Sequence, residues 1–344
     1  MSNQTNFPIA THPAEPRDHC KLLVLDRKTG RLEHLRFYDI IRFLNPGDCL
    51  VLNNSKVFPA RILFKSRDQE GELLLVQWPK NGEAVLAKTT GKCVKRLRED
   101  GGKVLFKDGS EGKIHILDFV ESERSFLVKI EALRPIEELG SPPLPPYILK
   151  TRKSQGASLN NEQDARAYQC VYAKNRGSIA APTAGMHWTD ELLNKVRATG
   201  VNIAEITLHI GLASMMKADD AKGESLPAEF YEMSQSVAEL INITKASGKK
   251  VIACGTSAVR TLETLRDEKG FMGAGDGATE LFIKPGYVFK AVDSMITNFH
   301  LPDATNFLLT QSFAGESIDL LATYREAASL DYRFFSYGDA MLIL

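Results

Sequence analysis

The 344-residue sequence has no long apolar run, no paired cysteines and no excess of charge of either sign. No stretch approaches the about 20 apolar residues that a membrane helix needs, so no membrane partner is expected. The N-terminus has neither an apolar signal core nor an Arg-rich amphipathic pattern, which favours a cytoplasmic protein. Because 43 basic residues balance 43 acidic ones, a nucleic-acid partner would have to be held by a local basic surface.

The cysteines are odd in number, widely spaced and without a Cys-x-x-Cys pair. No histidine stands at zinc-finger spacing from them, so neither a disulfide framework nor a zinc module is indicated. We expect reduced, structural thiols at all five positions, which are Cys20, Cys49, Cys93, Cys170 and Cys254.

The texture of the chain changes twice. From about residue 61 to 131, short strand-like runs are separated by hairpin-type breaks such as Asn81-Gly82, which is typical of a small antiparallel barrel or sandwich. The Pro-rich run 142–146 then predicts a stiff linker. Beyond it, strand-like and helical runs alternate, which predicts a mostly parallel or mixed sheet covered on both faces. The sequence therefore predicts an α/β domain of residues 1–60 and 147–344, with a β-barrel domain inserted at 61–146.

Within the second part, the expected elements can be placed by residue number. The expected strands lie near 178–182, 201–208, 251–255, 279–283 and 291–298, with a last one near the C-terminus. The expected helices lie near 189–199, 233–247, 257–267, 304–313 and 317–329. The glycine-rich stretch 270–277 follows a helix and matches no phosphate-binding fingerprint, so we interpret it as a flexible loop.

A short loop follows the predicted strand 178–182. Pro182 and Gly185 break the strand, and Thr189 with two acidic residues behind it is typical of a helix N-cap. In an open α/β sheet such a loop lies at the carboxyl edge, where ligands bind beside a helix N-terminus. The loop is therefore either a ligand-binding loop or an ordinary turn with His187 packed under the helix.

Three histidines, His187, His209 and His300, each stand at or just after the end of a predicted strand. Their separations are long and no carboxylate pattern accompanies them, so no metal is predicted. His209 lies in an apolar strand and also suits a core position. Asn298 and His300 share one face if their strand continues regularly, although both also suit a role in satisfying backbone groups at the strand end.

The loop Gly255-Thr256-Ser257 leads into a predicted helix that carries Arg260. Small residues let a ligand approach the backbone, hydroxyls can bond a carboxylate or ribose, and Arg260 can pair with a carboxylate. The alternative is an N-cap by Ser257 and a surface Arg260 that pairs with Glu263 on the same helix face. Near the C-terminus, Tyr337 and Asp339 offer a ring and a carboxylate, although Asp339 also suits a turn cap.

Basic residues gather at two places in the sequence. Either cluster could hold RNA phosphates, and either could be a solvated face. The clusters are Lys92, Lys95, Arg96, Arg98 and Lys103 in the predicted β domain, and Lys150, Arg152 and Lys153 after the Pro-rich run.

Several long, unusual sequence motifs are spread over the chain. One runs over 168–188 and includes Tyr-Gln-Cys-Val-Tyr-Ala-Lys and Ala-Ala-Pro-Thr-Ala-Gly-Met-His-Trp. The others lie at 15–18, 44–48, 208–211, 259–263, 297–302 and 332–343. Together these motifs resemble those of the S-adenosylmethionine:tRNA ribosyltransferase-isomerase family of queuosine synthesis.

The resemblance implies an uncommon use of S-adenosylmethionine. The ribosyl group is transferred to the amine of an aminomethyl-deazaguanine base at the tRNA wobble position and rearranged, giving epoxyqueuosine, while adenine and methionine leave. S-adenosylmethionine is then a substrate and no cofactor is implied; tRNA is the partner, and we expect a monomer. The reaction needs a pocket for the methionine zwitterion, a base for a proton made acidic by the sulfonium, and a group that assists adenine departure.

Candidate site residues follow from the resemblance and from the loops described above. The predicted catalytic residues are His187, His300, Glu229 and Asp339. The predicted substrate-binding residues are Pro182, Thr183, Gly185, His209, Gly255, Thr256, Ser257, Arg260, Asn298 and Tyr337.

The chain also departs from the family pattern. The family usually shows His-x-Met-His-x-Glu before Tyr-Tyr-Glu. Residues 224–232 keep only Glu229 of the first of these motifs and lack both histidines. A catalytically impaired, tRNA-binding relative is therefore the alternative function. An ordinary S-adenosylmethionine methyltransferase is disfavoured, because no Gly-rich strand-to-helix loop opens the α/β domain.

Overall fold

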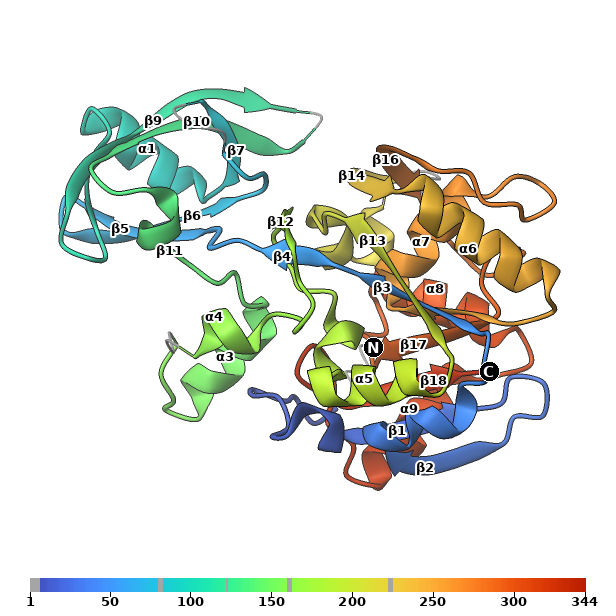
Figure 1. Cartoon of the computed structure of the whole chain (residues 1–344). Helices are drawn as coiled ribbons and strands as arrows, with labels where there is room; N and C mark the ends of the chain where they lie inside the picture. The colour runs from blue at the N-terminus through green and yellow to red at the C-terminus, as the bar shows by residue number, and fades with distance from the viewer. Residues whose placement is uncertain (1–6, 80–82, 122, 160–162, 222–224) are drawn as a thin grey trace.

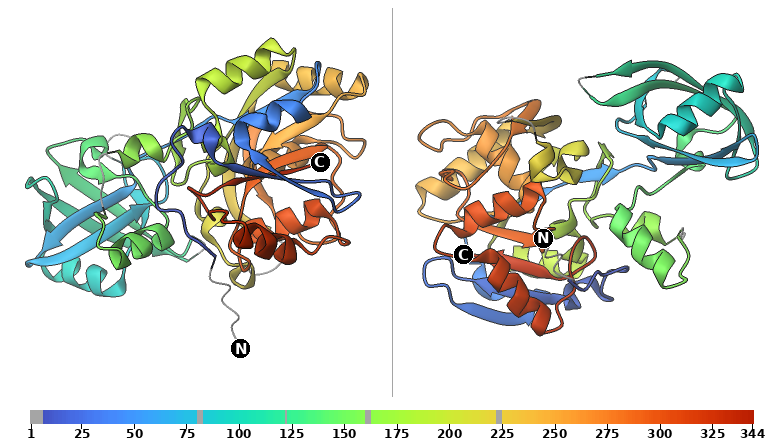
Figure 2. Two further views of the ribbon diagram at one scale, coloured as in Figure 1. Left: turned by 90° about the horizontal axis from the view of Figure 1, so that it is seen from below. Right: turned by 180° about the vertical axis from the view of Figure 1, so that it is seen from behind.

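The structure is a computed structural model that describes residues 7–79, 83–121, 123–159, 163–221 and 225–344. In these ranges the strands form a nine-stranded sheet, a seven-stranded sheet and a two-stranded pair. Figure 1 shows the two larger sheets apart from each other and joined by extended chain, and Figure 2 shows the same separation from below and from behind.

The nine-stranded sheet is mixed, as predicted. Parallel pairing joins β13, β3, β15 and β17, and also β1 and β18, whereas β17–β18 and the outer pairs are antiparallel. In spatial order its strands are β16 (Gly275–Leu281), β14 (Ser225–Met233), β13 (Asn202–Leu208), β3 (Cys49–Asn53), β15 (Val251–Cys254), β17 (Ser294–Asn298), β18 (Ala340–Ile343), β1 (Lys21–Leu25) and β2 (Leu32–Arg36).

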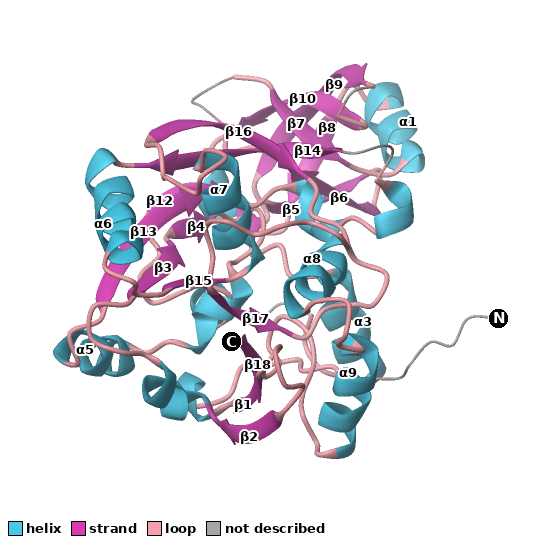
Figure 3. Cartoon of the chain, turned by 90° about the vertical axis from the view of Figure 1, so that its right-hand side faces the viewer, coloured by secondary structure: helices cyan, strands magenta, loops and turns pink. Residues whose placement is uncertain are grey.

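Helices cover both faces of this sheet (Figure 3). Along β3, Cys49 and Val51 enter one apolar cluster while Leu50 and Leu52 enter the other, because successive side chains of a strand point to opposite faces. The first cluster is completed by α6 (Gln235–Ala246), α7 (Thr256–Leu265), α8 (Thr305–Ala314) and α9 (Leu320–Ser329). The second is completed by α5 (Asp190–Ala198) and the 3-10 helix η2 (Phe37–Phe43).

The helices of the α/β part match the predicted ones within a few residues. Thr189 caps α5 as predicted, since its hydroxyl accepts a hydrogen bond from the Leu192 N–H at 3.1 Å. None of the helices in the described ranges is long and apolar enough to cross a membrane. All five cysteines are buried and unpaired, which confirms the prediction of reduced thiols.

The seven-stranded sheet is antiparallel throughout and has its own apolar cluster. One helix that the sequence reading missed, α1 (Gly91–Glu99), packs Cys93 and Leu97 into this cluster. The strands, in spatial order, are β11 (Gly140–Ser141), β5 (Arg61–Ser66), β6 (Gln69–Leu75), β7 (Val85–Lys88), β10 (Ser125–Ala132), β9 (Glu111–Val120) and β8 (Lys103–Phe106), and β5 also pairs with β8.

Three short helices connect this part back to the larger sheet. They are α2 (Ile136–Leu139), α3 (Pro146–Ser154) and α4 (Asp164–Ala167). The predicted linker 142–146 ends in α3, because a proline is well suited to the first turn of a helix, where its missing N–H has no partner to lose.

Three elements of the α/β part differ from the sequence prediction. The predicted strand 178–182 is wrong: β12 (Asn175–Ser178) pairs with β4 (Ser55–Val57) and ends there, and the 3-10 helix η3 (Thr183–His187) follows Pro182. Strand β14 was not predicted, since Pro227 interrupts its pattern. The predicted loop 270–277 ends in the first residues of β16. The remaining 3-10 helices are η1 (Arg17–His19), η4 (Leu212–Met215) and η5 (Ala218–Asp220).

Candidate active site

A cavity of about 500 Å³ lies beyond the carboxyl ends of β15 and β17. This is the edge of a parallel sheet where ligands commonly bind. The structure brings together at its wall most of the predicted site residues, namely Pro182, Thr183, Glu229, Gly255, Thr256, Ser257, Arg260, Asn298 and His300. Gly185, His187, His209, Tyr337 and Asp339 are not part of the lining.

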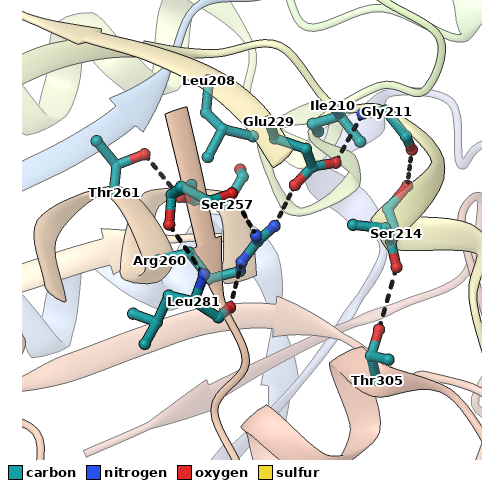
Figure 4. Close-up of polar contacts among 12 residues, drawn as sticks. Leu208, Ile210, Gly211, Ser214, Glu229, Ser257, Arg260, Thr261, Leu281 and Thr305 are labelled. Atoms are coloured by element: carbon teal, nitrogen blue, oxygen red, sulfur yellow. Dashed lines mark hydrogen bonds and ion pairs between the residues drawn. The ribbon is translucent and has the colours of Figure 1, made fainter. Parts of the chain in front are cut away.

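Glu229 and Arg260 form a buried ion pair at the cavity wall (Figure 4). The other Glu229 oxygen accepts a hydrogen bond from the Gly211 N–H at 2.7 Å. The Arg260 Nε donates to the Leu281 carbonyl at 3.0 Å, so both side chains are held from two sides. The surface pairing of Arg260 with Glu263 is absent, because Glu263 is buried and pairs with Arg266 instead.

The first turn of α7 is positioned by Asn53 at the end of β3. The Asn53 side-chain nitrogen donates to the Ser257 hydroxyl and to the Leu208 carbonyl, both at 3.0 Å. Gly255, which precedes the helix, has a φ of +94°, a conformation that favours glycine. The chain therefore turns tightly and presents the α7 N-terminus and the partly exposed Thr256 to the cavity.

Asn298 is the last residue of β17, and His300 follows two positions later. The His300 Nε2 lies 2.8 Å from the Thr297 hydroxyl, and the His300 backbone N–H donates to the Tyr324 hydroxyl at 3.1 Å. Burial lowers the pKa of His300 to about 4, so the ring is neutral at pH 7. The Asn298 nitrogen donates to the Phe335 carbonyl at 3.1 Å, whereas its oxygen is buried without a hydrogen-bond partner among the described residues.

His187 lies behind the cavity wall, as a packed histidine under the loop. Its Nδ1 is 3.2 Å from the Cys20 sulfur and its ring packs on Phe37. Burial, followed by the charge of Arg333, lowers its pKa to about 3. The ring is therefore neutral at pH 7. It does not contact the cavity directly, because other residues lie between them.

The other predicted residues outside the lining have close packing partners. Asp339 is buried, and its oxygens accept from the Lys21 and Arg333 backbone N–H groups at 2.9 and 2.7 Å. This arrangement matches the turn-capping alternative for Asp339. The Tyr337 ring packs edge-on against Tyr168, which does line the cavity.

Gly185 and His209 are also enclosed. A side chain at Gly185 would collide with the Tyr172 hydroxyl, so the glycine is needed for close packing. His209 bonds the Ser55 hydroxyl through Nδ1 at 2.9 Å, and burial lowers its pKa. His209 thus supports the contact between β13 and β4 from outside the cavity.

The lining also includes polar residues that the sequence reading did not single out. The Tyr147 hydroxyl lies 2.6 Å from the Ser336 hydroxyl. Lys217 and Asp303 form a 2.8 Å ion pair in which both side chains are exposed. Tyr147 directly follows the Pro-rich run, which the sequence predicts to be a linker. Lys217 and Asp303 lie in short connections, which carry no pattern of their own.

No group of three or more histidine, cysteine or acidic side chains in the described ranges is arranged to hold a metal ion. The lining instead offers hydroxyls, an amide, a neutral imidazole and a helix N-terminus. These groups suit a polar organic ligand with a carboxylate and sugar hydroxyls.

Comparison with known proteins agrees with this geometry. The family model described as queuosine biosynthesis protein matches residues 5–343. The S-adenosylmethionine:tRNA ribosyltransferase-isomerases of Staphylococcus aureus strains JH9 and MW2 are each 43% identical over 344 residues, covering 98% of this chain and 96% of theirs.

A solved structure is similar over the whole length. The crystal structure of S-adenosylmethionine tRNA ribosyltransferase from Thermotoga maritima is 31% identical, with a TM-score of 0.54, and the match covers 100% of this chain and 99% of that one. The chain therefore belongs to the queuosine biosynthesis protein family, that of the S-adenosylmethionine:tRNA ribosyltransferase-isomerases.

Proposed function

We propose that this chain transfers and isomerises the ribosyl moiety of S-adenosylmethionine onto the aminomethyl-deazaguanine base at the tRNA wobble position. The products are epoxyqueuosine-tRNA, adenine and methionine. One observation carries the proposal: motifs far apart in the sequence all contribute residues to one cavity. These motifs lie at 168–188, 208–211, 259–263, 297–302 and 332–343.

The cavity suits S-adenosylmethionine in size and chemistry. Its volume of about 500 Å³ lies within the range of small-molecule sites. Arg260 is already neutralised by Glu229, so the methionine carboxylate belongs at the N-terminus of α7, beside Thr256. The amide of Asn298 and the hydroxyl of Thr183 are available for the ribose and the adenine.

Proton transfer falls to groups that reach the cavity. Of the four predicted catalytic residues, only His300 and Glu229 line it. Both Glu229 oxygens are engaged, whereas the neutral His300 ring is fixed by Thr297 through Nε2 and its Nδ1 has no hydrogen-bond partner among the described residues. We infer that His300 is the base that takes the proton made acidic by the sulfonium.

We also propose the domain division that the sequence predicts: a catalytic part of residues 1–60 and 147–344, and an inserted barrel at 61–146. Two observations support a closed barrel. Strand β5 pairs with β6 on one side and β8 on the other, and every buried residue of that apolar cluster except Ile179 lies between positions 58 and 139. We further propose a monomeric, cytoplasmic enzyme with tRNA as partner and no cofactor beyond its substrate S-adenosylmethionine.

The test is a mass-resolved assay of the purified protein with S-adenosylmethionine and tRNA that carries the aminomethyl-deazaguanine base. Adenine release and the mass of the wobble nucleoside are followed together. Adenine with epoxyqueuosine establishes the function, and tRNA with guanine at the wobble position, as the control, should release no adenine. Binding of tRNA without either product would refute the proposal and favour the impaired relative, for which the comparisons give no support.

A further inference from the structure

A second cavity, of about 1030 Å³, lies in the part of the chain that folds around the seven-stranded sheet. Its walls come from β5, β6, the end of β7, the start of α1, and β8. Although the whole chain has no net charge, the cationic side chains here outnumber the anionic ones. We call this cavity the basic groove; its cationic residues are Arg61, Lys65, Lys88, Lys92, Arg96 and Lys107, and its acidic residues are Glu70 and Glu72.

The two arginines of the basic groove have partners within the protein. Arg61 pairs with Glu72 at 2.8 Å. Arg96 donates to the Gln69 side chain and to the Glu70 carbonyl, both at 2.8 Å. These contacts fix the walls and neutralise one of the two carboxylates.

The four lysines, in contrast, form no ion pair in the described part of the chain. Lys65, Lys92 and Lys107 are exposed, and Lys88 is partly buried. Burial lowers the pKa of Lys88, and the charge of Arg124 acts in the same direction. Several ammonium groups without counter-charges along one groove attract a ligand with several negative charges.

The start of α1 adds to this positive field. Thr90, Lys92 and Cys93 line the basic groove at the N-terminus of the nine-residue helix. The positive end of the helix dipole favours anions at this position. The lysines and the helix are separate features, and both select the same ligand chemistry.

One segment connects the basic groove to the first cavity. Tyr147, at the start of α3, lines the first cavity, and Leu159, a few residues after α3, lines the basic groove. Helical and extended rises limit the path between them to about 30 Å. Figure 1 shows α3 below the seven-stranded sheet and to the left of the nine-stranded one.

We propose that the basic groove binds phosphates of the tRNA stem while the wobble base occupies the first cavity; this inference rests on the proposed function. Each strand of a nucleic-acid duplex carries one charge per about 3.4 Å, so a path of about 30 Å spans on the order of ten phosphates of one strand. A tRNA stem is therefore long enough to reach the lysines while the wobble base stays in the first cavity. Contacts of this kind position the RNA and do not read its sequence.

The test compares two variants with the same loss of charge. The groove variant changes Lys65, Lys88, Lys92 and Lys107 to Gln. The control variant changes four exposed lysines that lie outside both cavities, Lys28, Lys249, Lys250 and Lys269, to Gln. Binding of tRNA with the aminomethyl-deazaguanine base is measured between about 50 and 200 mM salt, and KM is measured for tRNA and for S-adenosylmethionine.

Each phosphate contact contributes about 0.9 to the salt slope, so a fourfold rise in salt weakens binding about 3.5-fold per contact. The groove variant should lose a slope of about 3.6, show a higher KM for tRNA and keep its KM for S-adenosylmethionine. The control variant should match the unchanged protein. Thermal unfolding is compared in parallel, and a triple variant that keeps Lys88 serves if the quadruple one does not fold.

An unchanged salt slope and KM for tRNA in the groove variants would overturn the proposal, whatever the enzyme's activity. A failure of the proposed function looks different, because the unchanged protein would then release no adenine at all. A reduced slope in an enzyme that keeps its kcat at saturating tRNA is the result that supports the basic groove.

Discussion

The buried pair of Glu229 and Arg260 allows the sharpest prediction. Replacing Glu229 by Gln keeps the shape of the side chain and removes its charge. One glutamate oxygen accepts from the Gly211 N–H and the other from Arg260. Glutamine has a single oxygen, so in either orientation its NH₂ group must face a donor, and Arg260 is left buried without a counter-charge. Both effects destabilise the folded protein.

The expected cost can be estimated from the burial of the pair. Breaking a buried ion pair by removing one partner costs about 3–5 kcal/mol. For a chain of 344 residues, an unfolding entropy of about 2.1 cal/mol/K per residue converts this to about 4–7 °C in Tm. Differential scanning calorimetry measures the shift, and the adenine-release assay measures turnover.

A double variant separates the structural role of the pair from a catalytic one. Changing Glu229 to Leu and Arg260 to Met together removes both charges and restores much of the stability, because an apolar pair of similar volume avoids the desolvation cost. If the pair is structural and neither side chain takes part in the reaction, the double variant regains turnover along with stability. A Glu229→Gln variant that melts within 1 °C of the unchanged protein would refute the buried-pair reasoning.

Three further outcomes are expected. Because the pKa values of His187 (about 3) and His300 (about 4) lie below the usual 6.5, the unfolded state binds more protons and stability falls as the pH drops from about 6.5 towards 4; His300→Gln should reduce the loss between pH 7 and 5 by about 2 kcal/mol in urea unfolding. Gly185→Ala should cost about 1–3 kcal/mol by collision with Tyr172, whereas Gly91→Ala, which meets nothing, should be neutral in the same melts. Asp339→Asn should lower Tm while the folded fraction keeps its kcat, and a normal Tm with a hundredfold lower kcat would return Asp339 to the mechanism.

Local sequence was sufficient to predict much of the α/β part. Strand β3 is a continuous apolar run because both of its faces are covered. The start of α5 is indicated by its N-cap residue, Thr189. Helix α1 was missed although Thr90 caps it, because its apolar positions are few among basic residues. Tertiary burial of Cys93 and Leu97 stabilises that helix, and no local pattern reports such burial.

The site was predictable where it follows the ends of parallel strands. Gly255 and Asn298 reach the cavity for this topological reason. The partner of Arg260 was not predictable, because Glu229 lies on a strand that the sequence did not reveal. His187 stands in the expected loop, but η3 turns its ring inward, away from the lining. Which side of a short 3-10 turn faces the ligand is decided by packing.

The departures from the family pattern lie where they leave the cavity wall in place. Of the positions that replace the two family histidines, 224 lies outside the described residues, and Pro227 lies in β14 and does not line the cavity. Pairing of β14 with β16 is irregular between Ser225 and Glu229, since proline has no N–H to extend the ladder. Regular pairing resumes at Glu229, whose carboxylate is held by Arg260 and the Gly211 N–H, neither of which depends on the missing rings. The loss of both histidines therefore leaves the ion pair intact, and the proposed proton transfer to His300 does not depend on them.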